Sequence, residues 1–223
     1  MVLTTSHLAT AFDEVVDAAR STGLDVTVTH ETEPLGTGGA LKNAEEAIAG
    51  EAFLVVNADV LTTANIGWLV GFHRERRAEA TMMLTPVQDP SRYGVVPTDD
   101  DGRVTAFIEK PPPGEAVTNE INAGIYVMEP SILERIPAGR AVSAEHELFP
   151  PLVDDGRLFA ATTDAYWIDI GTPQSYLQAN LDALLRTGAE NVIDETAAVD
   201  ESAILAASCV GAGAVIEAGA QVE

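Results

Sequence analysis

The sequence is poor in cysteine, in lysine and in positive charge generally. Its single cysteine, Cys209, excludes a disulfide within the chain and is typical of a reducing compartment. The 35 acidic residues outnumber 12 basic ones, and the formal net charge of −23 would repel nucleic acid from most of the surface. Only Lys42 and Lys110 are lysines. We therefore expect no nucleic-acid partner, and any anionic substrate needs a locally basic pocket or a divalent metal.

Long hydrophobic runs are also missing. No run approaches the roughly 20 apolar residues that span a membrane, and no signal-peptide pattern follows Met1. We therefore expect a soluble, cytoplasmic protein with no membrane partner. The length of 223 residues and the hydrophobic content of 46% are enough for one substantial globular domain with a small appendage.

The stretch FLVVNADV at 53–60 predicts a strand that is buried on both faces and ends at a carboxylate. Ligands of open α/β sheets bind outside the carboxyl ends of the strands, so Asp59 is a candidate site residue. The run YWIDIGTP at 166–173 likewise places Asp169 beside a glycine turn. Two such aspartates could share one Mg²⁺, for which carboxylates and substrate phosphates are the usual ligands. The alternative is that each aspartate caps a local turn.

Apolar residues alternate between strand and helix patterns along most of the chain. Helical spacing over 12–19 leads to a strand at 24–30, and this strand, helix, strand opening is typical of a parallel sheet. Further segments follow the same logic: strands at 53–56, 80–87 and 121–128, helices around 68–72 and over 173–185, and an acidic hairpin turn at 99–102. The fold class predicted is therefore α/β.

Glycine and proline mark several loops that could contact a ligand. In the segment 31–41, Pro34 fixes a turn and the glycines allow close backbone approach of a phosphate or nucleotide before a helix. A flexible connection between strand and helix is the more common explanation of such glycines. Glu109 and Lys110 form either an exposed ion pair or a substrate contact. Gly124, inside a strand, indicates close approach of a ligand or of another backbone. The histidines, His73 among them, are interpreted as surface residues rather than catalytic ones.

From residue 191 the pattern changes. Ile193, Val199, Ile204, Val210 and Ile216 recur at a spacing of five or six with small residues between them. This is the pattern of a hexapeptide β-helix repeat, in which each strand needs neighbouring coils to bury its side chains. We place a partial nucleotidyltransferase-like α/β domain at 1–187 and the beginning of the β-helix at 188–223. Such repeats also form acyltransferase domains, but the coils present here are too few to form an acyltransferase site.

Taken together, these blocks resemble the sugar-phosphate nucleotidylyltransferases, and most closely the bacterial mannose-1-phosphate guanylyltransferases. The blocks that carry the resemblance are PLGTGGAL at 34–41, NADV at 57–60, RYGVV at 92–96, FIEKP at 107–111, NAGIYV at 122–127, VSAEHELFP at 142–150 and YWIDIGTP at 166–173. The resemblance implies a Rossmann-like, mostly parallel sheet flanked by helices, followed by the start of a left-handed parallel β-helix. It also implies transfer of a nucleoside monophosphate from a triphosphate to a sugar 1-phosphate.

The resemblance implies a role for each matching residue. Asp59 and Asp169 would hold Mg²⁺, and Lys110 would bind the sugar phosphate. The nucleotide would contact Glu31, Pro34, Gly36 and Thr37, and the sugar would contact Tyr93, Gly94, Glu109, Asn122 and Gly124. A carboxylate at Glu31 can accept two hydrogen bonds from guanine, which favours GTP. Glucose-1-phosphate thymidylyl-, uridylyl- and adenylyltransferases are the alternatives.

One family motif is missing from these 223 residues. Relatives carry a loop of the pattern G-G-x-G-T-R, followed by a K-P segment, and the two wrap the triphosphate. These 223 residues contain no such loop with a K-P segment after it; the K-P pair at Lys110–Pro111 belongs to the block FIEKP. We therefore expect an N-terminally incomplete sheet that lacks a central strand and exposes the two strands that would flank it. We also expect weak or no activity from this chain alone. A non-catalytic regulatory subunit that binds a nucleotide sugar is the second hypothesis. Since β-helices of the family serve assembly, a homo-oligomer is a further expectation.

Overall fold

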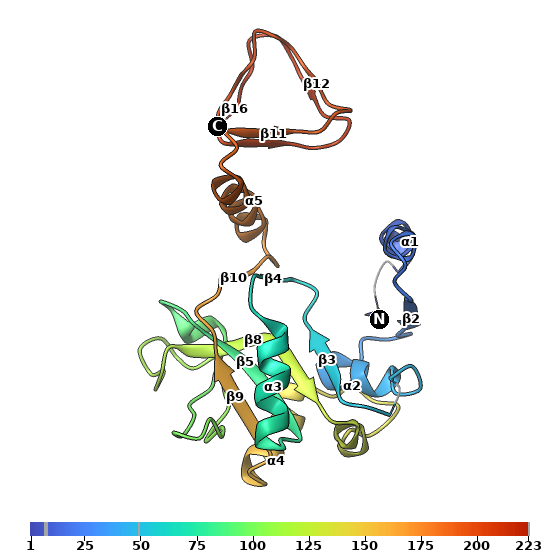
Figure 1. Cartoon of the computed structure of the whole chain (residues 1–223), viewed down its shortest axis with the longest axis vertical. Coiled ribbons are helices and arrows are strands. Elements are labelled where there is room, and N and C mark those ends of the chain that lie inside the picture. The colour runs from blue at the N-terminus through green and yellow to red at the C-terminus, as the bar shows by residue number, and fades with distance from the viewer. Residues whose placement is uncertain (7–8, 49, 223) are drawn as a thin grey trace. The chain divides into compact units, whose positions relative to one another are not determined.

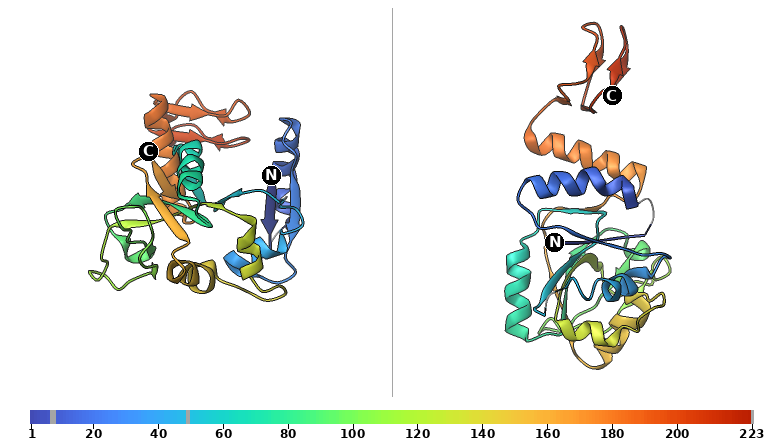
Figure 2. Two further views of the ribbon diagram at one scale, coloured as in Figure 1. Left: turned by 60° about the horizontal axis from the view of Figure 1, so that its bottom comes forward. Right: turned by 90° about the vertical axis from the view of Figure 1, so that its right-hand side faces the viewer.

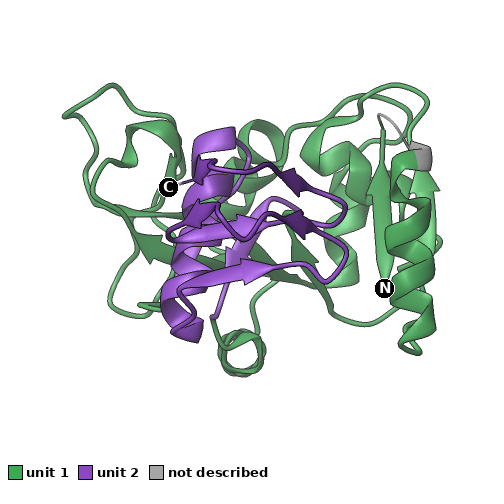
Figure 3. Cartoon of the chain, turned by 90° about the horizontal axis from the view of Figure 1, so that it is seen from above, with its two compact units in different colours: residues 1–57, 64–165 green, residues 58–63, 166–223 purple. Residues whose placement is uncertain are grey.

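The computed structural model describes residues 1–6, 9–48 and 50–222, and the chain divides into two compact units (Figure 3). Unit 1 comprises residues 1–57 and 64–165, and unit 2 comprises residues 58–63 and 166–223. The predicted boundary between residues 187 and 188 stays a prediction. Among the described helices, none is long and apolar enough to cross a membrane.

Unit 1 begins with a small parallel pair of strands. Strand β1 (Val2–Thr5) pairs in parallel with β2 (Thr27–His30), and the connection carries the short helix η1 (Ala9–Phe12) and α1 (Asp13–Ser21). The Thr5 hydroxyl lies 2.9 Å from His30 Nδ1 at the end of the pair. The predicted strand, helix, strand opening is confirmed.

The main sheet of unit 1 is mixed. Its order is β7-β6-β8-β5-β9, and β3 also pairs with β8. The strands are β3 (Phe53–Val56), β5 (Ala80–Pro86), β6 (Gly94–Val95), β7 (Ile108–Glu109), β8 (Glu120–Met128) and β9 (Leu158–Thr162). Strand β8 runs antiparallel to β3, β5 and β6, while β5 and β9 are parallel. The expectation of a mostly parallel sheet is therefore wrong, because β8 is antiparallel to three strands and β7 is antiparallel to β6, so that only β5 and β9 pair in parallel.

Helices cover both faces of this sheet (Figures 1 and 2). Helix α3 (Ile66–Arg76) packs on one face against β5, β8 and β9. The other face carries α2 (Gly36–Asn43), η3 (Pro130–Arg135), the π-helical turn η4 (Ala144–Leu148) and α4 (Phe149–Asp154); a short helix, η2 (Pro90–Arg92), precedes β6. Met82 and Leu84 of β5 join Phe149 in the core, whereas Thr81 faces α3, as the two-residue period of a strand requires. Each fully buried large side chain contributes about 1.5–3 kcal/mol.

Strand β3 has one open edge. Among the described strands it pairs only with β8, and Leu54 and Val56 are 45% and 47% exposed. Residues of β1, α2 and β3 line a pocket of about 400 Å³ here. The prediction that this strand is buried on both faces is therefore wrong, because Leu54 and Val56 on one of its faces are exposed.

Unit 2 begins with an antiparallel pair of strands. Strand β4 (Val60–Thr62) pairs with β10 (Trp167–Asp169). Helix α5 (Pro173–Thr187) follows, and it confirms the helix predicted over 173–185. Thr172 and Ser175 form a capping box at its start, and Gly188 ends it with a φ of 68°.

Three parallel strand pairs complete unit 2. They are β11 (Asn191–Ile193) with β14 (Ser208–Val210), β12 (Ala198–Val199) with β15 (Val215–Ile216), and β13 (Ile204–Leu205) with β16 (Gln221–Val222). In Figure 1 they form the sides of a triangle. Hydrogen bonds between consecutive turns join residues 17 apart, such as Ser208 N to Asn191 Oδ1 at 2.9 Å. The chain therefore passes twice around the same path.

Candidate functional site

Asp59 and Asp169 lie side by side in unit 2. The pairing of β4 with β10 sets Asp169 opposite Val60, and Ile170 N donates to Asp59 O at 2.8 Å. Gly171 N donates to Asp169 Oδ1 at 2.8 Å. A Cβ on Gly171 would lie 2.9 Å from Asp169 Oδ1 and 3.4 Å from Asp59 Oδ2, so both carboxylates reach the same glycine. Backbone pairing therefore brings together two acids that are distant in sequence.

The chemistry of this pair suits a hard divalent cation. Asp59 is exposed and Asp169 is half-buried, so each carboxylate keeps access to solvent. Mg²⁺ is usually held by one or two carboxylates together with substrate phosphates and water, rather than by a complete protein cage. In the described part of the chain, no group of three or more His, Cys, Asp or Glu residues is arranged to hold a metal. Two carboxylates thus fit a metal that the substrate helps to bind.

A second group of the proposed site residues lies on β6 and β7 of unit 1. Gly94 pairs with Glu109, and a Cβ on Gly94 would come within 2.6 Å of the Phe107 ring and 3.0 Å of Glu109 Oε2. Lys110 N donates to Tyr93 O at 3.1 Å, and its ammonium lies 3.5 Å from Glu109 Oε1. The Lys110 side chain is 66% exposed, so this ammonium is accessible to an anion.

Asn122 and Gly124 are neighbours on β8. Asn122 Oδ1 accepts from Gly124 N at 3.0 Å, and Asn122 Nδ2 donates to the Tyr126 hydroxyl at 2.8 Å. Gly124 has a φ of 72°, and a Cβ there would lie 2.8 Å from Asn57 Nδ2. Asn57 N also donates to Gly124 O at 2.8 Å. A close approach at Gly124 is therefore observed, but the approaching group is the Asn57 side chain rather than the ligand or backbone that was predicted.

The phenol of Tyr126 is buried beside Asn122 and lies within the electrostatic influence of Glu109 and Glu145. Burial raises the pKa of its phenol well above the ordinary value, and the negative charges of Glu145 and Glu109 raise it further, while the hydrogen bond from Asn122 opposes them. The phenol is therefore neutral and holds the Asn122 amide in one orientation. Sequence reasoning did not single out Tyr126 or Asn57, because their roles depend on contacts across the sheet.

The segment around Gly36 packs against residues 140–145. Glu31 Oε2 accepts from Leu35 N at 2.8 Å, which closes the turn before α2. Gly36 has a φ of 71°, and a Cβ there would lie 2.7 Å from Val142 O, so a side chain would collide with backbone. Pro34 is exposed at the start of this turn.

The amides at the start of α2 are already hydrogen-bonded. Gly38 N and Gly39 N both donate to Val142 O, at 2.9 and 3.2 Å. The Thr37 hydroxyl donates to Glu145 Oε2 at 2.7 Å and accepts from Ala144 N at 2.8 Å. The two glycine amides are therefore engaged within the protein rather than free to cradle a phosphate.

The predicted site residues thus form three local groups. Asp59 and Asp169 meet in unit 2, the residues of β6, β7 and β8 gather on one sheet of unit 1, and Glu31 to Thr37 form the turn that leads into α2. Gly171 was not selected from the sequence, although an acid two residues before a glycine was the available signal.

Comparison with known proteins gives one family and several relatives. Residues 1–185 match the model of the nucleotidyl transferase family. The chain is 39% identical over 186 residues to a mannose-1-phosphate guanylyltransferase of Mycobacterium tuberculosis, covering 82% of this chain and 51% of that protein. It is 41% identical over 180 residues to a mannose-1-phosphate guanylyltransferase catalytic subunit beta of Drosophila pseudoobscura pseudoobscura, covering 79% and 48%. The chain thus spans about half the length of these relatives.

Solved structures show the same architecture. HddC from Yersinia pseudotuberculosis matches with a TM-score of 0.66 and 31% identity, covering 80% of this chain and 76% of that one. The same protein complexed with GMP-PN matches with a TM-score of 0.65. A Bacillus anthracis protein described as a putative glucose-1-phosphate thymidylyltransferase shares the fold, with a TM-score of 0.70 at 22% identity over 82% of this chain and 75% of that one.

Proposed function

Because the chain belongs to the nucleotidyl transferase family, we propose that it carries much of the active site of a mannose-1-phosphate guanylyltransferase. In the proposed reaction an oxygen of mannose 1-phosphate attacks the α-phosphorus of GTP. The bond between the α-phosphorus and its bridging oxygen breaks, and GDP-mannose and pyrophosphate are formed. The names of relatives at 39% and 41% identity support the sugar and the base. The GMP-PN complex of HddC supports a guanine nucleotide.

The observation that carries the proposal is the convergence of Asp59 and Asp169 at Gly171. We assign Mg²⁺ to these two carboxylates, where it would neutralise charge on the reacting phosphates. The two side chains supply anionic ligands, and the Gly171 amide orients Asp169 by donating to its Oδ1. The small glycine leaves the space that both carboxylates require.

We assign the sugar phosphate to Lys110 and the sugar hydroxyls to its neighbours. The Lys110 ammonium is accessible and lies 3.5 Å from the Glu109 carboxylate. Gly94, Asn122 and Gly124 keep backbone and amide groups close to this surface, and Tyr93 fixes the Lys110 backbone through its carbonyl. Positioning two polyanions in line is the main task of such an enzyme.

We assign base recognition to the turn that contains Glu31, Pro34, Gly36 and Thr37. One oxygen of Glu31 is used by Leu35 N, which leaves acceptor capacity on the carboxylate for the N1–H and exocyclic amine of guanine. A nucleobase that presents a hydrogen-bond acceptor where guanine presents its N1–H or exocyclic amine would be repelled by the Glu31 carboxylate.

The strand pairs of unit 2 and the cysteine content support two further assignments. We propose that the three parallel strand pairs of unit 2 are the first coils of a left-handed β-helix and that this surface serves homo-oligomer assembly; the constant offset of 17 residues between the pairs supports the repeat. A cytoplasmic setting is supported by the single cysteine.

A second candidate is a non-catalytic subunit that binds a nucleotide sugar. The observation that favours it is that the Gly38 and Gly39 amides at the start of α2 donate to Val142 O and are not free to hold a phosphate. Pyrophosphate release from GTP and mannose 1-phosphate by the chain distinguishes the two. Turnover that Asp169→Asn abolishes supports the enzyme, whereas binding of GDP-mannose without turnover supports the subunit. Turnover with a different sugar phosphate and none with mannose 1-phosphate would overturn the substrate assignment.

A further inference from the structure

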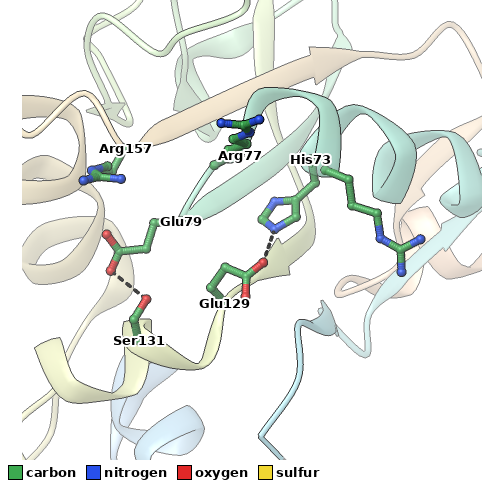
Figure 4. A pocket seen from close by; sticks show the side chains of 8 residues that line it. His73, Arg77, Glu79, Glu129, Ser131 and Arg157 are labelled. Atoms are coloured by element: carbon green, nitrogen blue, oxygen red, sulfur yellow. Dashed lines mark hydrogen bonds and ion pairs between the residues drawn. The ribbon is translucent and has the colours of Figure 1, made fainter.

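A second pocket in unit 1 concentrates unpaired positive charge. It has a volume of about 550 Å³ and lies where α3 ends and β5, η3 and β9 begin, with His73, Arg77, Glu79, Glu129, Ser131 and Arg157 visible in its wall (Figure 4). Arg74 also lines it. In a chain with 35 acids and 12 bases, such a pocket is a local exception to the prevailing charge.

The arginines of this pocket differ from most others in the chain. Six of the ten arginines have a guanidinium that forms a hydrogen bond, ion pair or ring contact. The other four, Arg74, Arg77, Arg92 and Arg157, form none with any residue that the structure describes. Three of these four line this one pocket. Their donors are therefore available to a ligand.

The two carboxylates in the pocket are already engaged. Arg135 holds both oxygens of Glu79, at 2.8 and 2.9 Å, and Ser131 Oγ donates to it at 3.2 Å. Glu129 Oε1 lies 3.2 Å from His73 Nε2. Arg157 also lowers the pKa of Glu79 through its charge, without a direct contact. The lining carries three arginines against two carboxylates, one of which is paired with Arg135, so the pocket keeps a net attraction for anions.

His73 gives the pocket a fixed wall. Its side chain is 1% exposed, with Nδ1 2.8 Å from the Thr81 hydroxyl and Nε2 directed at Glu129. The prediction that His73 is a surface residue is therefore wrong, because partners on β5 and after β8 enclose it. His30 and His146 lie outside the lining of the pocket, and His7 lies outside the described residues.

The backbone at Arg77 sets the point at which its side chain leaves the end of α3. Arg77 ends α3 in the left-handed conformation, with a φ of 51°, where glycine is the usual residue. A non-glycine residue there costs about 1 kcal/mol. An arginine kept at this position places a guanidinium beside the pocket.

We propose that this pocket binds a phosphorylated small molecule whose phosphate is held by Arg74, Arg77 and Arg157. Guanidinium groups match phosphate oxygens with pairs of N–H donors, which makes arginine the preferred residue for such anions. The volume suits a small metabolite. This site is separate from the residues assigned to nucleotidyl transfer and does not depend on that assignment.

The test uses the imidazole NMR signals of the ¹⁵N-labelled chain, which has four histidines. The variants His7→Gln, His30→Gln and His146→Gln identify the other three signals and leave that of His73. Inorganic pyrophosphate and glucose 6-phosphate are titrated separately at ionic strength matched with sodium chloride. We expect a saturable shift of the His73 signal with at least one of them.

The variants decide the assignment. The double variant Arg77→Gln/Arg157→Gln is expected to weaken the affinity measured at His73 by about tenfold or more, because it removes charge-assisted hydrogen bonds. The matched control is Arg92→Gln, which removes an equally unpaired charge outside the pocket and should leave that affinity unchanged. Saturation by pyrophosphate alone indicates a diphosphate ligand, and saturation by both indicates a phosphate ester. No saturable shift of His73, or equal affinity in the double variant, would overturn the proposal.

Discussion

Asp59 and Asp169 approach the same glycine, with Asp169 Oδ1 2.9 Å and Asp59 Oδ2 3.4 Å from the position of a Cβ on Gly171. The antiparallel pairing of β4 with β10 creates this relationship, because Asp169 pairs with Val60, the residue after Asp59. Two carboxylates that share one glycine can act on one cation, so the pair carries the metal assignment.

The substitution Asp169→Asn tests the metal site. Asparagine keeps an oxygen that can accept from Gly171 N but removes the charge, so we expect Mn²⁺, used as a spectroscopic probe for Mg²⁺, to bind about tenfold or more weakly. Electron paramagnetic resonance of free Mn²⁺ measures the affinity. The matched control is Asp164→Asn, at an exposed aspartate outside the pair, which should leave the affinity unchanged. Equal affinities in the wild type and both variants would contradict the assignment.

The substitution Gly94→Ala tests the packing beneath the proposed sugar site. Its methyl group would come within 2.6 Å of the Phe107 ring, which packs against Phe149 at a centroid distance of 5.2 Å. We expect a loss of about 1–3 kcal/mol in unfolding free energy, since the core must shift. Thermal unfolding measures it, with Gly71→Ala as control.

The control should behave in the opposite way. Gly71 lies inside α3 with nothing within 4 Å of a Cβ, so alanine should raise the stability of the helix by about 0.5–1 kcal/mol. A Gly94→Ala protein as stable as Gly71→Ala would show that the ring does not require the glycine.

The substitution Glu31→Gln separates base recognition from turn structure. Glutamine can still accept from Leu35 N, so the melting temperature should change little, but it cannot offer two anionic acceptors to guanine. We expect affinity for GDP-mannose to fall roughly ten- to a hundredfold. The exposed neighbour Glu33→Gln is the control. A variant that loses stability and affinity together would assign Glu31 to the turn alone.

The Glu79–Arg135 pair gives a pH dependence. Hydrogen bonds from Arg135 hold the pKa of Glu79 below its ordinary value, against the opposing effect of burial. A carboxyl group whose pKa is lowered by folding stabilises the fold fully above its unfolded-state pKa of about 4.3. This stabilisation is lost as the pH falls through the folded-state pKa. We expect Arg135→Gln to cost about 1 kcal/mol at pH 7 and to reduce the loss of stability on acidification from roughly pH 5 to 3.

The comparison for that experiment is Arg140→Gln. Arg140 also contacts a carboxylate, Glu147, but the two side chains are 52% and 41% exposed, so water screens the pair. Its melting curves should follow those of the wild type between pH 3 and 7. If both substitutions changed the stability equally, the lower exposure of Glu79 would not make its ion pair more stabilising than the exposed pair, which would contradict the prediction.

Local patterns in the sequence were sufficient for the helices. The spacing of apolar residues predicted α5 to within two residues of its observed end, and it located α3 only around residues 68–72, inside the observed helix Ile66–Arg76. The direction of β8 was not predictable, because an apolar strand pattern does not encode which strands it pairs with. Burial of His73 was missed for the same reason, since Thr81 and Glu129 enclose it through tertiary contacts.

In the candidate site, too, single residues were predictable from the sequence but the contacts between them were not. Asp59 and Asp169 were recognisable as acids at strand ends, and Gly124 was recognisable as a point of close approach. The register that joins the two acids, and Asn57 as the group that approaches Gly124, depend on strand pairing that only the fold provides. The unpaired arginines of the second pocket come from α3 and from the start of β9, so no sequence motif marks them.

The most direct test is a calorimetric titration of the chain with GDP-mannose, because the enzyme and the nucleotide-sugar-binding subunit both require this binding. We expect one molecule to bind saturably with Mg²⁺ present, about tenfold or more weakly when Asp169→Asn removes a metal ligand. UDP-glucose should bind more weakly than GDP-mannose, since uracil presents an acceptor at the position where guanine donates. No heat of binding, or equal affinity for UDP-glucose, would contradict the account.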